Sequence, residues 1–99
     1  MTFIIKIEPE AKLDIQEGID WYNEKEAGLG RTFHSAVKAH LKKLTTNPFF
    51  QIRYDKARCL PLKKFPYLIH FTIDEKNTRV IVHAILNTAR EPKIWKDRK

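Results

Sequence analysis

Two stretches in the first half of the chain repeat apolar residues every three or four positions, which is the period of one helix face. The first begins at Pro9, which suits the first turn of a helix, and is predicted to end near Gly28. Its stripe consists of Ala11, Ile15, Ile19 and Tyr22. The second follows Gly30, is predicted to end at Asn47-Pro48, and has a stripe of Phe33, Val37, Leu41 and Leu44. The short Gly28-Leu29-Gly30 turn between them predicts an antiparallel helical hairpin.

The rest of the chain follows the two-residue period of β-strands. The segment from Phe3 to Ile7 is rich in β-branched residues and stops before Pro9, which indicates a first strand. Three later segments alternate in the same way, at 59–63, 67–74 and 80–87. The expected fold is therefore α+β with the order β-α-α-β-β-β. We expect an antiparallel sheet with the two-helix hairpin packed on one face, followed by a short basic C-terminal tail.

The turn-like segment 74–78 predicts a hairpin in which Ile73 pairs with Val80. In this register one face is apolar and can cover the helices, through Tyr67, Ile69, Phe71, Ile73, Val80, Val82, Ala84 and Leu86. The other face holds Leu68, His70, Thr72, Ile81, His83, Ile85 and Asn87. His70 and His83 would then be direct cross-strand neighbours, able to move protons or to hold a phosphate. Two exposed histidines without a catalytic task are the simpler alternative.

Composition limits the class of protein. A single domain over residues 1–99 is expected, because 99 residues with 42% hydrophobic content can bury one modest core. The net charge of +7 favours polyanions or acidic proteins as partners. Cys59, the only cysteine, is expected to be a small buried side chain in a reducing cytosol. The N-terminal apolar run is too short to span a membrane and no signal peptide is apparent, so we expect a cytoplasmic protein without a membrane partner.

Candidate binding residues are basic rather than metal-ligating. The sequence has no His-Glu-x-x-His, no His-x-His and no paired cysteines, so we expect no metal and no small-molecule cofactor. Basic residues lie near aromatic ones in two places and could neutralise phosphates while a ring stacks on a base. The first segment has Arg53, Lys56, Arg58, Lys63 and Lys64 as its basic residues, and the second has Arg90 and Lys93 with the aromatic Trp95. A charged, solvated surface around a small core is the alternative.

Six short motifs occur in an order that resembles a known family. They are Ala11-x-x-Asp14-Ile15, Asp20-Trp21-Tyr22, Gly28-Leu29-Gly30-x-x-Phe33, Asn47-Pro48, Lys64-Phe65-Pro66-Tyr67 and Arg90-x-Pro92-x-x-Trp95. This order resembles the RelE/ParE toxin superfamily in its plasmid-stabilisation branch. The resemblance implies the same fold, a growth-arresting toxin of a type II toxin–antitoxin pair, and a cognate antitoxin that covers the toxin. We expect the antitoxin on the basic sheet face and on the helical hairpin, at Trp21, Tyr22, Phe33, Val37 and Leu41.

The resemblance leaves the target open. Members that cleave messenger RNA on the ribosome carry basic residues where this chain has Leu68, Cys59 and Pro61, and relatives commonly have histidine in place of Asn87. Asparagine cannot exchange a proton, which favours poisoning of DNA gyrase without a catalytic centre. The alternative is a ribosome-dependent mRNA endonuclease with a tentative site of His70, His83, Arg90, Lys63 and Asn87. A non-toxic basic RNA-binding or adaptor module is the alternative of another class.

Overall fold

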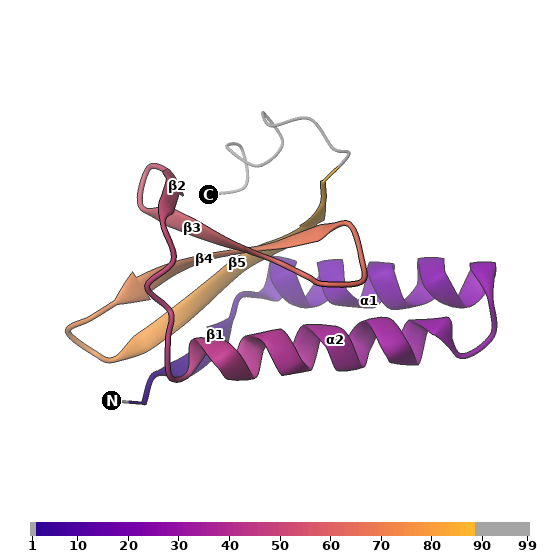
Figure 1. The fold of residues 1–99 in the computed structure, drawn as a ribbon, viewed down its shortest axis with the longest axis horizontal. Helices are drawn as coiled ribbons and strands as arrows, with labels where there is room; N and C mark the ends of the chain where they lie inside the picture. Colours follow the sequence, from indigo (N-terminus) through magenta and orange to yellow (C-terminus); the bar gives the residue numbers. More distant parts are fainter. Residues whose placement is uncertain (1, 89–99) are drawn as a thin grey trace.

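A computed structural model describes residues 2–88, which form a five-stranded sheet with two helices packed on one face (Figure 1). The α+β class expected from the sequence is confirmed. The elements are β1 (Ile4–Ile7), α1 (Pro9–Lys25), α2 (Leu29–Leu44), β2 (Ile52–Tyr54), β3 (Ala57–Pro61), β4 (Tyr67–Asp74) and β5 (Arg79–Asn87). Within the described part of the chain, no helix has both the length and the apolar character needed to cross a bilayer.

The sheet is mixed, with the strand order β1-β5-β4-β3-β2. The first strand pairs in parallel with the last, Ile5 opposite Val80, whereas all other neighbouring strands are antiparallel. Parallel neighbours need a long crossover, and the chain between β1 and β5 supplies one. The sequence pattern therefore erred in making the whole sheet antiparallel. It also missed β2, because three residues are too few to show alternation.

The helical hairpin has the predicted stripes, with one shift. All four stripe residues of α2 are buried, as predicted. In α1 the buried residues are Ala11, Asp14, Gly18 and Tyr22, while Ile15 and Ile19 are half-buried. The buried face of α1 therefore includes Asp14 and Gly18, each one position before the apolar residue that the sequence pattern placed there. The helix also ends at Lys25, earlier than Gly28, which has the left-handed backbone conformation (φ 88°) that starts α2.

Four aromatic rings form the centre of the core between the hairpin and the sheet. Phe33 is fully buried, and its ring centroid lies 5.2 Å from Tyr22, 5.3 Å from Phe65 and 4.9 Å from Tyr67. Tilted and edge-on contacts at such distances add to the free energy gained by burying the rings. Gly18 is opposite the Phe33 ring, where a Cβ atom would lie 2.5 Å from Cε2. A residue without a side chain is thus required for this ring to reach α1.

The β4–β5 hairpin begins in the predicted register and then departs from it. Ile73 pairs with Val80 as expected, but His70 pairs with Ala84 and the adjacent Phe71 with Val82. His83 is therefore an extra residue in β5, a β-bulge that reverses which residues face the helices beyond it. The core accordingly takes Val80, Val82 and then Ile85 from β5. The predictions that Ala84 and Leu86 cover the helices, and that Ile85 faces away, are wrong.

The buried carboxylate of Asp14 joins α1 to β5 beyond the end of β1, where the edge of β5 has no described strand beside it. Strand β1 pairs with β5 only as far as Val82. Farther along, the backbone N–H of Ile85 donates to Oδ2 of Asp14 at 3.0 Å. A buried N–H without an acceptor is costly, so Asp14 satisfies the sheet edge where β1 ends.

Replacing Asp14 with alanine is expected to lower the free energy of unfolding by about 1–3 kcal/mol, because the Ile85 N–H loses its acceptor. Asp14→Asn keeps a side-chain oxygen and should lose less. Asp20→Ala is the matched control, since Asp20 lies on the same helix and accepts a hydrogen bond from Gln16 on the exposed surface. Urea titration measures all three variants. Equal stabilities of Asp14→Ala and Asp20→Ala would contradict this role for Asp14.

Candidate functional site

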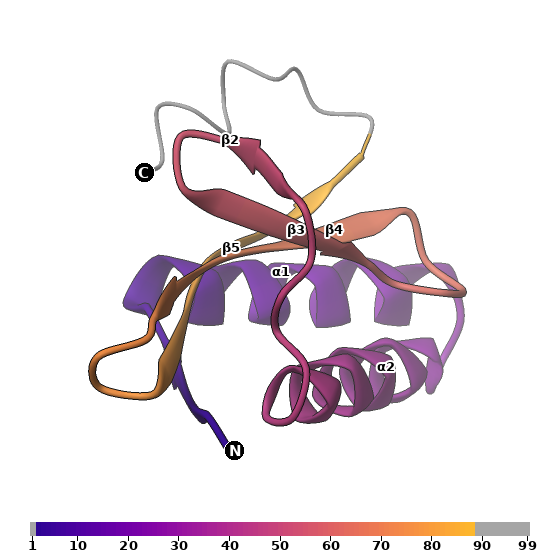
Figure 2. The same cartoon turned by 60° about the vertical axis from the view of Figure 1, so that its left-hand side comes forward.

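The sheet face opposite the helices, called the outer face below, holds both histidines of interest, but not as a pair. His70 lies opposite Ala84, and His83 occupies the bulge. The expected register, with His70 directly opposite His83, is therefore wrong. Each histidine instead has its own neighbours, and β2 curls over this face to supply one of them (Figure 2). On the outer face, His70 lies with Tyr54 and Cys59, and His83 lies with Thr72.

The first group centres on His70, which is fully buried. Its Nδ1 lies 2.9 Å from the Tyr54 hydroxyl and 3.4 Å from Sγ of Cys59, the residue opposite it in β3. Burial raises the pKa of the Cys59 thiol and raises that of the Tyr54 phenol to about 12. Both neighbours thus keep their protons at neutral pH and can donate to Nδ1 of His70. The group is suited to joining strands, because its members are covered and protonated.

Alkaline titration of the tyrosines is expected to show one phenol with a pKa near 12, which Tyr54→Phe removes. Burial favours the neutral phenol, so its pKa is above the ordinary 10.0. The stability that Tyr54 contributes is complete below its unfolded pKa and is lost as the pH rises through about 12. Ultraviolet absorbance follows the phenolate. Titration of Tyr54 near pH 10 in the folded chain would contradict its burial against His70.

The second group centres on His83, which is partly exposed. Its Nε2 lies 2.8 Å from the Thr72 hydroxyl. These two residues, with Asp55, Lys56 and Ala57 of the β2–β3 hairpin, line an open hollow of about 430 Å³. An imidazole, a hydroxyl and an ammonium group together can hold a phosphate, although the Asp55 carboxylate at the rim opposes an anion. Of the two outer-face histidines, only His83 is reachable by a ligand.

The basic residues expected to bind nucleic acid do not form one surface. Arg53 and Lys56 are exposed on the β2–β3 hairpin, and Lys63 and Lys64 are exposed in the loop between β3 and β4. Arg58 is partly buried and belongs to the other face, because it pairs with the core residue Phe71. Its Nη1 donates to the Phe50 carbonyl at 3.0 Å, and its guanidinium lies 5.5 Å from the Phe49 ring centroid. Arg58 thus has a structural task, whereas the hairpin and loop cations stay accessible.

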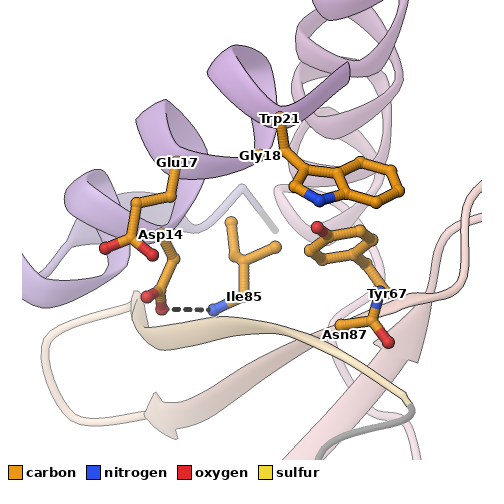
Figure 3. Close-up of a pocket in the computed structure, with 7 residues that line it drawn as sticks. All are labelled: Asp14, Glu17, Gly18, Trp21, Tyr67, Ile85 and Asn87. Atoms are coloured by element: carbon orange, nitrogen blue, oxygen red, sulfur yellow. Dashed lines mark hydrogen bonds between the residues drawn. The ribbon is translucent and has the colours of Figure 1, made fainter. Parts of the chain in front are cut away.

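Asn87 lies on the side of the sheet that the helices cover, not with the histidines. It pairs with Tyr67, and both residues line a cleft of about 360 Å³ between α1 and β5. Figure 3 shows this α1–β5 cleft, which is also lined by Asp14, Glu17, Gly18, Trp21 and Ile85. The bulge at His83 causes this placement, since it reverses the facing of every later residue in β5. The tentative catalytic set is therefore divided between two faces.

Of the residues expected to contact an antitoxin, four are buried and one is exposed. Phe33 and Val37 are fully buried, and Tyr22 and Leu41 are each 8% exposed. Their side chains fill the core beneath the sheet and leave little surface for a partner. Trp21 is different, because it is 49% exposed beside the α1–β5 cleft. Arg90, Lys93 and Trp95 lie outside the described residues.

Sequence reasoning missed the group around His70. Cys59 was interpreted as a simple buried side chain, and it is buried, but it also contacts His70. Tyr54 lies in a strand too short to be detected, so nothing in the sequence placed it across the sheet. Among residues 2–88, no cluster of three or more histidine, cysteine or acidic side chains is arranged to hold a metal ion.

Comparison with known proteins gives agreement in structure only. No protein-family model matches the sequence, and no curated protein matches it. A chain of the chromosomal ParDE toxin–antitoxin system from P. aeruginosa superposes with a TM-score of 0.78 at 14% identity, over 87% of this chain and 96% of that one. A mutant of the E. coli toxin RelE in the free state superposes with a TM-score of 0.72 at 13% identity, over 99% of this chain and 95% of that one.

The toxin–antitoxin complex RelBE2 from Mycobacterium tuberculosis also contains a similar chain, with a TM-score of 0.62 at 13% identity over 88% of this chain and 99% of that one. Identities this low carry no information about individual site residues. Nearly complete coverage on both sides nevertheless means that the helical hairpin and the sheet are arranged alike. The chain has the fold of the RelE and ParE toxins, as the order of its sequence motifs led us to expect.

Proposed function

We propose that this chain is the toxin of a type II toxin–antitoxin pair, and that it arrests growth by binding DNA gyrase rather than by cleaving RNA. The choice of gyrase over RNA cleavage rests on the bulge at His83. It places His70 opposite Ala84 instead of His83 and turns Asn87 to the helix side, which supports a target that needs no acid–base site built from these three residues. His70 is fully buried with protonated neighbours, which supports a structural role.

The toxin assignment is supported by the fold and by the charge. The structural neighbours belong to toxin–antitoxin systems, and a net charge of +7 suits a protein that meets a polyanionic complex or an acidic partner. Arg53 and Lys56 project from the β2–β3 hairpin and would supply contacts to such a target. We expect an Arg53→Gln, Lys56→Gln double variant to bind more weakly and with a smaller dependence on salt.

The test is tightly controlled expression of the chain alone. Growth should stop, transcripts should remain intact, and DNA should be recovered as linear fragments from trapped gyrase. Co-expression of the cognate antitoxin should restore growth. Normal colonies from soluble, folded protein would exclude the toxin and favour a non-toxic RNA-binding or adaptor module.

One observation favours the nuclease as the second candidate. The hollow beside His83 combines an accessible imidazole with Lys56, and one histidine can take a 2′-hydroxyl proton. Primer extension after induction separates the two mechanisms, because ribosome-dependent cleavage leaves cuts in phase with codons. Growth arrest by His83→Gln should equal that of the parent chain if gyrase is the target. Codon-phased cuts that disappear in His83→Gln would establish the nuclease instead.

A further inference from the structure

The described lining of the α1–β5 cleft has a charge opposite to that of the whole chain. The chain carries +7, yet α1 has five carboxylates and only two lysines. Two of these carboxylates, Asp14 and Glu17, line the cleft, and no lysine or arginine is among its described lining residues. A partner that covers this side of the molecule therefore meets local negative charge, and not the positive charge that composition alone suggests.

The cleft also has a defined shape. Figure 3 shows the carboxylates of Asp14 and Glu17 at one end, the rings of Trp21 and Tyr67 at the other, and Ile85 between them. Asp14 is fixed by its hydrogen bond from the Ile85 N–H, whereas Glu17 is exposed on the next turn of the helix. The cleft is thus an apolar floor with an acidic end and an aromatic end.

Trp21 already accepts a cation in this structure. The Lys25 ammonium lies 4.7 Å from the centroid of the Trp21 ring. Such a contact is favourable because the ring face carries partial negative charge, and it is stronger for planar guanidinium groups that stack. Trp21 is also held edge-on against Tyr22 at 4.9 Å, so the half-exposed ring is presented in a fixed position.

We infer that the α1–β5 cleft receives an arginine side chain from the protein partner of this chain. The aliphatic part of the arginine lies beside the Trp21 ring and on Ile85, and its guanidinium donates to Glu17 at the acidic end of the cleft. The charge and the shape of the cleft favour this occupant, because the two carboxylates repel an acidic side chain and attract a long cationic one. This inference rests on the proposed function for the identity of the partner, an antitoxin, but the cleft can be tested without it.

The probe is the peptide acetyl-Ala-Arg-Ala-amide, titrated into the full chain labelled with nitrogen-15. We expect shifts of the Trp21 indole N–H and of the Gly18 and Asn87 amides. The matched peptide acetyl-Ala-Gln-Ala-amide should leave these signals unchanged. Glu17→Gln should weaken arginine binding about two- to fivefold, because an ion pair at an exposed carboxylate is lost. Glu24→Gln, which removes a carboxylate of α1 outside the cleft lining, should have no effect.

Three outcomes would overturn the inference. Equal shifts with the arginine and glutamine peptides would make the cleft non-selective. Arginine binding that is insensitive to Glu17→Gln would place the site elsewhere. Cleft signals that depend on protein concentration without peptide would identify a second copy as the occupant. None of these measurements uses growth arrest, so a failure of the inference is distinguishable from a failure of the proposed function.

Discussion

Replacing Phe33 with alanine is expected to lower the free energy of unfolding by about 3–5 kcal/mol. The ring is fully buried and contacts Tyr22, Phe65 and Tyr67, so its removal leaves a cavity bordered by rings that cannot close it. Domains have a total stability of about 5–15 kcal/mol, and the loss corresponds to a fall in Tm of more than about 10 °C. Thermal and urea unfolding followed by circular dichroism measure it.

The control is Phe49→Ala, which removes the same side chain where it is 53% exposed. Phe49 contacts Phe3 and Arg58, so its loss should cost about 1–2 kcal/mol, still well below the loss for Phe33→Ala. The comparison of the two variants also tests whether Phe33 acts in the core or at the antitoxin interface, where the sequence pattern placed it. Any loss of antitoxin binding by Phe33→Ala should follow the unfolded fraction of the protein. A stable Phe33→Ala protein that fails to bind the antitoxin would return this residue to the interface.

The second large effect is expected at Gly30, where the α2 backbone lies directly against α1. A Cβ atom there would collide with the backbone oxygen of Ile19 and would lie 2.6 Å from the Asn23 amide. The same amide accepts the Gly30 N–H at 2.8 Å and so joins the helices at this point. Gly30→Ala must therefore separate α1 from α2 or break this hydrogen bond. We expect a loss of about 3 kcal/mol, because a backbone oxygen cannot move aside.

Gly28→Asn is the matched control for Gly30→Ala. Nothing lies within 4 Å of a Cβ atom at Gly28, and its positive φ of 88° is tolerated by asparagine better than by other residues. Its cost should be below about 1 kcal/mol. Differential scanning calorimetry compares the two variants with the parent chain. Similar melting temperatures for both variants would mean that the hairpin relaxes at Gly30 without strain.

The sequence by itself determined the elements whose evidence is local. The stripe from Phe33 to Leu44 has a strict helical period, and every member is buried. The turn at 74–78 brought Ile73 opposite Val80, because a hairpin register is defined close to its turn. Pro9 marked the first turn of α1 for a similar local reason. These features depend on neighbours a few residues apart, which a sequence displays directly.

Only the tertiary structure decided which faces those elements present to one another. Ala84, Ile85 and Leu86 are all apolar, so the sequence fits either facing, and the bulge at His83 could not be read from it. That single extra residue turned Asn87 into the α1–β5 cleft and placed His70 opposite Ala84 instead of His83. Likewise, an apolar stripe looks the same whether it covers its own sheet or awaits a partner. Contacts between residues far apart in the chain settle such choices, and local periodicity contains no information about them.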